Sequence, residues 1–353
     1  MKVNLVDEAD FLNMGDEWNE LTNYAKTTIF DTFEWLSTLW KHIRRERVEL
    51  FIIKVMDDGE LVGLAPLIIR KMLGIKIISH LGDGPSDYCN LILKETKKIS
   101  VIKRIILYLF NEYTDWDIIL LNDVPDTFML TIVRALSRLP YIKWFTSSLC
   151  PYINYRNLAE NWDNFVLKLS PKTRKHVRRA LRMVDKFKVK FVEGTANDLQ
   201  MFIDLHQKRW INKGEKSILS SQIMKDFHNN IAKKFAEKNW LDLSFLVIND
   251  KAISSVYGFR YKRKFYYYLT GFDPEYTKYF KEGITFTHTV YLIKKFMENG
   301  FDEFDFLRGT EEYKLKLARN LHHNLRIIIY KNYLSQLKEI IFSKLNKIEE
   351  LLA

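Results

Sequence analysis

One order of predicted elements occurs twice in this chain, about 190 residues apart, and this repeat limits the fold more than any other feature. Each copy opens with a short run of β-type residues, KVNLVD from Lys2 and KVKFVE from Lys188. Each continues with an apolar run broken by a turn, at Asp58-Gly59 or at Asn249-Asp250, which predicts a β-hairpin. The repeat therefore predicts two domains of the same mixed α/β class.

In the second copy a strand, a helix and another strand follow the hairpin. Aromatic and β-branched residues over 265–270 predict the first strand, which we expect to end in a turn at Gly271. Apolar residues with helical spacing predict a helix from Ile284 to Asn299, and residues 304–307 predict the next strand. A helix of roughly 15 residues between two strands favours parallel pairing, with ligands at the carboxyl ends of the strands. The polar residues at those ends are Asp273, Glu275, Arg308, Thr310, Glu311, Glu312, Tyr313 and Lys314.

The first copy has the matching helix over 101–113 and the matching strand over 116–124. Each copy then ends alike: a helix over 128–139 and a strand over 142–145 correspond to a helix from Glu312 and a strand over 325–330. We predict an N-terminal domain over 1–156, a basic helical connector over 157–187, a C-terminal domain over 188–331 and a terminal amphipathic helix over 332–353.

The composition is that of a folded protein. With 353 residues, of which 47% are hydrophobic, the chain is long enough for two packed domains. It has no run of about 18 apolar residues and no charged-then-apolar leader, so we expect no transmembrane segment and a cytoplasmic location, with contact to the inner face of the membrane left open. Cys89 and Cys150 are not spaced for metal binding, so we expect neither a Cys-ligated zinc nor a disulfide scaffold.

The net charge of +11 favours anionic partners, such as a CoA-type phosphate, a nucleotide sugar, an RNA or an acidic membrane, although a Lys-rich proteome explains it equally. Part of the charge lies on the connector, where Ser170 and Pro171 predict the start of a helix. Arg174, Arg178 and Arg182 share one face of that helix and predict either a polyanion site or a solvated surface. No aromatic residues interleave with them, which argues against a single-strand nucleic-acid platform.

Several motifs together resemble the GNAT superfamily of acyltransferases, in the branch of cellulose and exopolysaccharide biosynthesis proteins. They are SPKTRKHVRRALR, LHQKRW, YYYLTGFDPEY, the single glycine at Gly283, and FDFLRGTEEYK, and the resemblance covers roughly residues 161–319. TFEWLSTLWKH and LGDGPSDYCNLIL resemble the N-terminal half of the same proteins. The doubled order is also similar to the Fem-type aminoacyl transferases, which join amino acids from tRNA to peptidoglycan precursors with two GNAT-like domains. The resemblance implies a tandem GNAT-like fold and an acyltransferase enzyme.

The resemblance also implies roles for residues after the last strand of the second copy. Tyr313 stands where such families keep a tyrosine that protonates a leaving thiolate, and Lys314 corresponds to a lysine that stabilises an oxyanion or leaving oxygen. Asp305 is expected to act as base or to orient the acceptor amine. Arg308 is expected to bind an anionic group of the acceptor or to pair with Asp305, and Asp273 to order its turn or to touch substrate.

For the donor, the resemblance implies acetyl-CoA or another acyl-CoA as co-substrate, and no metal. The usual phosphate-binding loop is incomplete, because Phe280 stands where an Arg or Gln is expected and no second glycine follows Gly283. Lys278, Lys281 and the helix start at Gly283, Ile284 and Thr285 are the residues left to bind phosphate. The matching region of the first copy, residues 82–90, is acidic and lacks the tyrosine–lysine pair, which predicts a substrate-binding or structural copy.

The expected function is therefore transfer of an acyl group to the amine of a sugar or amino-acid-like acceptor, a glycan or peptide precursor, in cell-surface polysaccharide or cell-envelope synthesis. Two alternatives stay open at this stage. One is a Fem-type transferase that uses aminoacyl-tRNA, and the other is a non-catalytic GNAT-like scaffold. None of the three involves DNA.

Overall fold

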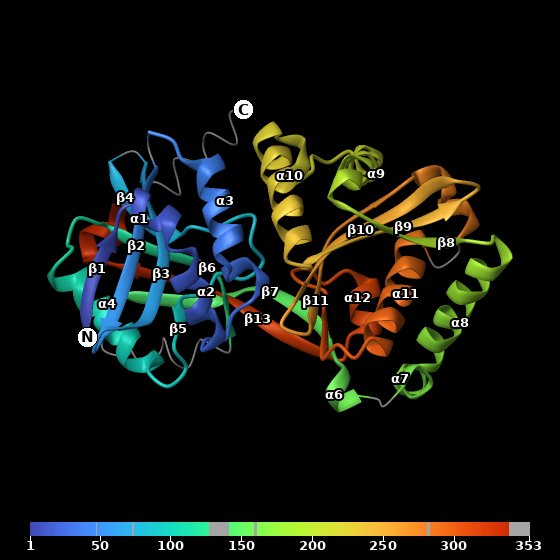
Figure 1. Cartoon of the computed structure of the whole chain (residues 1–353), viewed down its shortest axis with the longest axis horizontal. Helices are drawn as coiled ribbons and strands as arrows, with labels where there is room; N and C mark the ends of the chain where they lie inside the picture. Colours follow the sequence, from blue (N-terminus) through green and yellow to red (C-terminus); the bar gives the residue numbers. More distant parts are fainter. Residues whose placement is uncertain (47, 73, 127–140, 159–160, 281–282, 339–353) are drawn as a thin grey trace. The chain divides into compact units, whose positions relative to one another are not determined.

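A computed structural model describes residues 1–46, 48–72, 74–126, 141–158, 161–280 and 283–338 (Figure 1). The chain forms two compact units, each with a sheet and packed helices. Unit 1 consists of residues 1–148 and the chain from residue 323 onward, and unit 2 consists of residues 149–322. The predicted mixed α/β class is confirmed.

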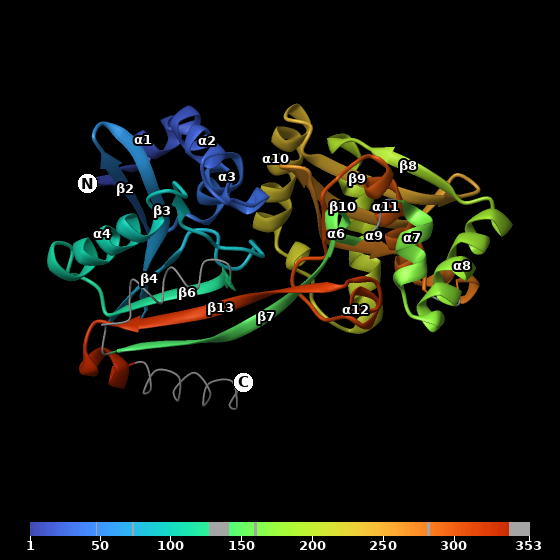
Figure 2. The same ribbon diagram turned by 90° about the horizontal axis from the view of Figure 1, so that it is seen from below.

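Unit 1 is a mixed sheet with helices on both faces (Figure 2). Helix α4 contributes Val101, Ile105 and Leu109 to a core with one face of the sheet. On the other face Lys54 of β2 reaches Glu17 of α2, at 2.7 Å. The elements are β1 (Lys2–Val6), α1 (Glu8–Asn13), α2 (Gly15–Asn23), α3 (Phe33–Ile43), β2 (Val48–Asp57), β3 (Glu60–Met72), β4 (Ile75–His80), β5 (Ile92–Leu93), α4 (Lys98–Asn111), β6 (Ile118–Pro125) and the later part of β13 (Asn320–Tyr330). The strand order is β1-β2-β3-β4-β6-β13.

Unit 2 has the strand order β7-β12-β11-β10-β9-β8. Helices α7, α8 and α11 share a core with Val256, Phe265 and Phe304 on one face of this sheet. Helices α9 and α10 pack on the other face, where Tyr257 contacts Phe202 and His228 (Figure 1). The elements are the later part of β7 (Ile142–Asn154), α6 (Tyr155–Leu158), α7 (Trp162–Lys168), α8 (Pro171–Lys186), β8 (Lys190–Gly194), α9 (Leu199–Lys213), α10 (Gln222–Glu237), β9 (Leu241–Ile248), β10 (Lys251–Tyr261), β11 (Lys264–Phe272), the short helix η4 (Pro274–Tyr279), α11 (Ile284–Glu298), β12 (Glu303–Asp305) and α12 (Glu312–Leu317).

The repeated elements are present in both units. The two hairpins turn where predicted, through positive φ angles at Asp58-Gly59 and at Asn249-Asp250. In each unit a helix joins two parallel strands, β4 to β6 through α4 and β11 to β12 through α11. The predicted helix start is also confirmed at α8, where the Ser170 hydroxyl accepts a hydrogen bond from the Thr173 amide at 3.2 Å.

The unit boundaries differ from the predicted ones. Strand β13 was assigned to the C-terminal domain, but its later part pairs with β6 in unit 1, as in Ile328 with Leu120. The predicted connector belongs to unit 2, because Val177 and Ala180 of α8 are buried in the core that α11 shares with the sheet. The predicted helix over 128–139 lies outside the described residues, as does the terminal helix beyond residue 338. Residues 333–338 are helical.

Gly271 lies inside β11 rather than in the predicted turn. A glycine is needed at this position because the backbone of α9 passes close to it. A Cβ at Gly271 would lie 2.5 Å from the His206 nitrogen and 2.7 Å from the Leu205 carbonyl carbon. We therefore expect Gly271→Ala to push α9 away from β11 and to lower the free energy of unfolding by about 1–3 kcal/mol, measured by chemical denaturation. Gly15→Ala is the contrasting variant, because Gly15 has no positive φ and an added Cβ would approach only the side chain of Phe33, at 3.1 Å. Equal destabilisation by the two changes would contradict the close approach.

Candidate active site

Strands β11 and β12 separate after three paired residues. They pair in parallel at Lys264, Phe265 and Tyr266, whereas β11 continues to Phe272. Strand β12 ends at Asp305, and the chain turns away through Leu307, which has a φ of 58°. Residues 267–272 of β11 therefore have no partner in β12. Such an opening between parallel strands is where this type of α/β unit places a ligand.

A chain of hydroxyl groups lies at this opening. The Tyr313 hydroxyl of α12 is hydrogen-bonded to that of Tyr267, which lies 2.8 Å from the Thr289 hydroxyl. Thr289 also lies 2.8 Å from the carbonyl oxygen of Thr285. Because a carbonyl oxygen only accepts, Thr289 donates to Thr285, Tyr267 to Thr289, and Tyr313 to Tyr267. A chain of hydrogen bonds, all donated in the same direction, thus connects Tyr313 to the first turn of α11.

Both tyrosines keep their protons at neutral pH. Burial raises the pKa of Tyr267 to about 12, against the opposing effect of the hydrogen bond that it accepts from Tyr313. Burial, followed by the nearby Tyr267 and Glu311, raises the pKa of Tyr313 well above its usual value. The positive charge of Arg209 acts in the opposite direction on both pKa values. Tyr313 is therefore a neutral proton donor beside a cation that would stabilise its ionised form.

Two side chains of α9 form hydrogen bonds with Thr270, in the part of β11 that lies beyond its last pair with β12. The carbonyl oxygen of Thr270 accepts from His206 Nδ1 at 2.7 Å and from Arg209 Nη1 at 3.2 Å. Arg209 also donates to the Thr270 hydroxyl. His206 is neutral, because burial lowers its pKa to about 4, and its Nε2 accepts from Ser217 at 2.7 Å. These contacts fix the Arg209 guanidinium at the open end of β11.

Asp305 is buried at the end of β12, and its Oδ1 accepts from the Leu307 amide at 2.8 Å. Its neighbours Phe304 and Phe306 lie in the core with α11, so the alternation of a strand directs Asp305 to the opposite face. Burial, and next the charge of Glu303, raise the pKa of Asp305 to about 6, while nearby His322 lowers it. A carboxyl group with this pKa is suited to act as a general base near neutral pH.

Lys314 is buried and holds the turn between β12 and α12. Its Nζ donates to the Arg308 carbonyl oxygen at 2.7 Å and pairs with Glu311 Oε2 at 2.9 Å. The Arg308 side chain is half-buried on the same turn. Lys314 thus has a structural contact in addition to its predicted oxyanion role, which stays a prediction, as does the role of Arg308.

Asp273 orders the segment before α11. It accepts from the Glu275 amide at 3.1 Å, and its carboxylate pairs with Lys208 at 3.0 Å and Lys251 at 3.2 Å. These contacts outweigh the effect of burial, so the pKa of Asp273 lies below its usual value. Asp273 therefore has the predicted ordering role, and its contact with substrate stays a prediction.

The predicted phosphate-binding segment lies at the start of α11. Gly283 has a φ of 90° and open space beside it, and no side chain among the described residues caps the helix there. Ile284 is buried and Thr285 is half-buried, while Lys278 is exposed on η4. Lys281 lies outside the described residues. Uncapped amide groups at a helix start fit a phosphate group, so this segment keeps its predicted role as a prediction.

None of the contacts described above includes an arginine of α8. Arg178 and Arg182 are exposed and Arg174 is half-buried. Arg182 donates to the Arg178 carbonyl oxygen, and neither Arg174 nor Arg178 forms an ion pair with another described residue. The helix thus presents a basic surface on unit 2.

The matching strand ends of unit 1 are closed by their own loop. Beyond the last pair of β4 and β6, at Ser79 and Leu120, the Cys89 amide donates to the Asp123 carbonyl oxygen of β6 at 2.9 Å. Asn324 of β13 donates to the carbonyl oxygen of Asp87 in the same loop at 2.8 Å. Main-chain groups of Asp87 and Asp123 at this end of unit 1 are thus hydrogen-bonded within the unit, and its predicted non-catalytic role stays a prediction.

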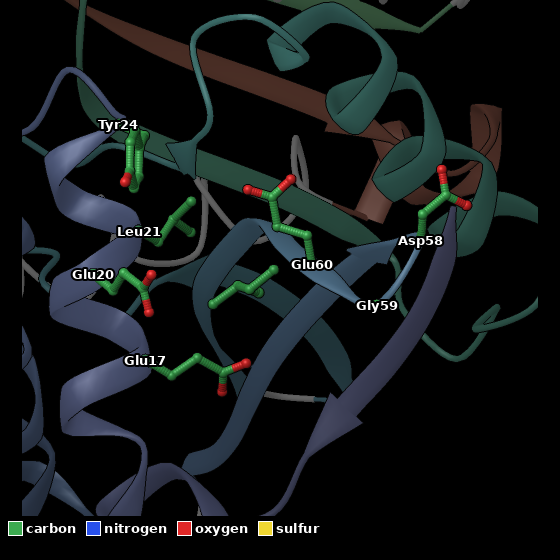
Figure 3. A pocket seen from close by; sticks show the side chains of 8 residues that line it. Glu17, Glu20, Leu21, Tyr24, Asp58, Gly59 and Glu60 are labelled. Carbon is green, nitrogen blue, oxygen red and sulfur yellow. The ribbon is translucent and has the colours of Figure 1, made fainter.

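Unit 1 also has an acidic pocket of about 500 Å³ between α2 and the β2–β3 turn (Figure 3). Glu17 pairs with Lys54 and Glu60 pairs with Lys94, so two of its carboxylates are neutralised. No residue that the sequence predicted for the site is among those that line it, which are Glu17, Glu20, Leu21, Tyr24, Asp58, Gly59, Glu60 and Leu61. The chemistry of the predicted site therefore does not reside in this pocket.

The sequence predictions missed Tyr267, Thr289 and Arg209. Tyr267 was interpreted only as a strand residue, although it alternates with Phe265 and so shares the face toward α11. Arg209 lies in the LHQKRW motif, which supported the resemblance without a role for the arginine. No local pattern indicates that α9 would place Arg209 against β11, since the two are about 60 residues apart in the chain.

Comparison with known families supports this assignment of unit 2. Residues 171–315 match the family model described as "Acetyltransferase (GNAT) domain". The match begins at the first residue of α8 and ends one residue after Lys314, so it includes both sides of the opening. Residues 171–315 are therefore similar to a GNAT acetyltransferase domain, and the predicted acyltransferase class is confirmed. No curated protein matches the chain by sequence.

Solved structures resemble the chain over almost its whole length. FemX has a TM-score of 0.66 at 13% identity, over 96% of this chain and 99% of FemX. L-PGS from Bacillus licheniformis has a TM-score of 0.58 at 11% identity, over 94% and 96%. A conserved protein of unknown function from Bacteroides thetaiotaomicron has a TM-score of 0.57 at 11% identity, over 93% and 100%. At these identities the likeness is one of fold, and it extends over both units of the chain.

Proposed function

We propose that unit 2 transfers an acyl group, from acetyl-CoA or another acyl-CoA, to the amine of a sugar or amino-acid-like acceptor used in cell-surface polysaccharide or cell-envelope synthesis. The observation that carries this proposal is the opening between β11 and β12, with Tyr313 on one side and Asp305 at the end of β12. The match of residues 171–315 to a GNAT domain supports the acyl chemistry. The cellulose and exopolysaccharide branch rests on the resemblance of motifs alone.

In the proposed reaction the acceptor nitrogen attacks the acyl carbonyl carbon, the new C–N bond forms, and the C–S bond of the donor breaks. Asp305, directly or through a water, takes the proton that the nitrogen loses. Tyr313 turns its hydroxyl from Tyr267 and gives its proton to the departing sulfur. The charge of Arg209 stabilises the remaining tyrosinate. The products are an amide and the free thiol, and proton exchange with solvent restores both residues.

A second candidate is a Fem-type reaction, in which the donor is an aminoacyl-tRNA and a ribose hydroxyl leaves in place of the thiol. Two observations favour it. The exposed basic surface of α8, with Lys175, Arg178, Arg182 and Lys186, suits a polyanion. The fold likeness to FemX extends over both units, not only over the acyltransferase domain.

Mass spectrometry of reaction products tests both candidates. The full chain is incubated with acetyl-CoA and a panel of amino acids and amino sugars, and separately with aminoacyl-tRNA and cell-wall precursors. N-acetylated products support the CoA donor, and aminoacylated products formed only with tRNA support the second candidate. Failure of both donors would contradict an acyl-transfer function, and a scaffold role would then predict that replacement of Tyr313 and Lys314 leaves the cellular function intact.

A further inference from the structure

Arg209 is an anchored cation with one free edge. Its Nη1 is held by the carbonyl and the hydroxyl of Thr270, a residue of β11 beyond its last pair with β12. Gly271 allows the backbone of α9 to come close enough for this contact. Nε, in contrast, is buried and has no hydrogen-bond partner among the described residues. Nε and Nη2 form the edge of a guanidinium that binds carboxylates with two parallel hydrogen bonds.

No negative charge of the described chain balances this cation. His206 beside it is neutral, since burial lowers its pKa to about 4, and Tyr267 and Tyr313 are protonated. Glu311, the carboxylate that acts on the same tyrosines, is paired with Lys314 at 2.9 Å. Lys208, the preceding residue of α9, pairs with Asp273 instead. A buried charged donor without a partner is costly, so a ligand anion at this edge would be stabilising.

We propose that Arg209 binds a carboxylate of the acceptor, which makes the preferred acceptor an amine that carries a carboxylate, as amino acids and peptides do. A planar carboxylate fits the single Nε–Nη2 edge, whereas a phosphate group needs donors in several directions and no second unpaired cation contacts this point in the described residues. The ring centroids of Trp210 and Phe272 lie 5.8 and 5.9 Å from the guanidinium carbon. The inference rests on the proposed function, and it selects the amino-acid-like acceptor over the neutral amino sugar.

Calorimetric titration tests the inference in the full chain without a donor. The probes are alanine and alanyl-alanine, their C-terminal amides, and glucosamine 6-phosphate. The variants are Arg209→Gln, Arg209→Lys and the control Lys213→Gln, an exposed cation one turn along α9. We expect the carboxylates to bind tighter than their amides, and we expect Arg209→Gln to weaken carboxylate binding by roughly 10- to 100-fold. Arg209→Lys should keep part of the binding, and Lys213→Gln all of it.

Three results would overturn the inference: no carboxylate-dependent binding, equal binding by Arg209→Gln protein with an unchanged melting temperature, or stronger binding of glucosamine 6-phosphate than of the carboxylates. If Arg209→Gln fails to fold, the comparison of Arg209→Lys with wild type decides, because a lysine keeps the charge but not the paired donors. The titration contains no donor, so it separates the two proposals. Carboxylate binding without any acyl transfer would refute the proposed function alone.

Discussion

Replacing Tyr313 with phenylalanine is expected to lower kcat by about 10²- to 10³-fold, with little change in KM for either substrate. The hydroxyl is the proton donor to the leaving group in the proposed reaction, so its loss acts on the transition state. The ring remains packed against Phe306, at a centroid distance of 6.5 Å. The fold should therefore persist, with at most about 1 kcal/mol lost from the hydrogen bond to Tyr267.

Steady-state kinetics with the donor found active by mass spectrometry measures this effect, and circular dichroism checks the fold. Tyr279→Phe is the matched control, because Tyr279 lies on η4 with 44% of its surface exposed. Tyr267→Phe should cost less than Tyr313→Phe, since Tyr267 only orients the Tyr313 hydroxyl. A folded Tyr313→Phe protein with wild-type kcat would rule out the proposed acid.

Replacing Asp305 with asparagine is expected to lower kcat/KM by about 10²-fold at pH 7.5 and to remove the acidic limb of the pH profile. In the wild type this limb should lie near pH 6, because the pKa of Asp305 is raised to about 6, chiefly by burial. The base is ionised above that pH and lost below it. An asparagine keeps an oxygen for the Leu307 amide but cannot take a proton. An unchanged profile in Asp305→Asn would exclude Asp305 as the base.

Asp305→Asn, which should lower activity, should at the same time increase stability relative to the wild type as the pH rises. The folded pKa of Asp305 exceeds its usual value of 3.8, so the folded protein binds this proton more tightly than the unfolded chain. The resulting stability is present below about pH 4 and is lost as pH rises through about 6. The wild type should lose on the order of 1–3 kcal/mol of stability in this way, and Asp305→Asn should not. The unfolding free energy of the variant should therefore rise relative to that of the wild type between pH 4 and 7. If the unfolding free energies of Asp305→Asn and the wild type differ by the same amount at every pH, the raised pKa of Asp305 is contradicted.

The fold was largely predictable because its signals are local and occur twice. The turns at Asp58-Gly59 and Asn249-Asp250 need residues that tolerate positive φ angles, and the sequence supplies them in both hairpins. The unit boundaries were not predictable in the same way. The apolar run of β13 fits the edge of either sheet, and only the pairing of Leu325 and Ile328 with β6 assigns it to unit 1.

The site was predictable only in part, for a related reason. Tyr313 and Asp305 lie in one continuous segment, so the resemblance of that segment indicated both. Arg209 reaches the site only because α9 packs on β11 at Gly271, a contact between distant parts of the chain. The chain of hydrogen bonds from Tyr313 to Thr285 likewise depends on three separate elements, α12, β11 and α11. The sequence names residue types, whereas their contacts come from tertiary packing.

The central claim is that the open end of β11 in unit 2 is a catalytic site for acyl transfer to an amine. The most direct test is mass-spectrometric detection of an N-acylated acceptor, formed by the wild-type chain and by Tyr313→Phe from the same donors and acceptors. The account predicts product with the wild type and an initial rate about 10²- to 10³-fold lower with the variant. Product formed at equal rates by both, or by neither with any acyl-CoA or aminoacyl-tRNA donor, would contradict it.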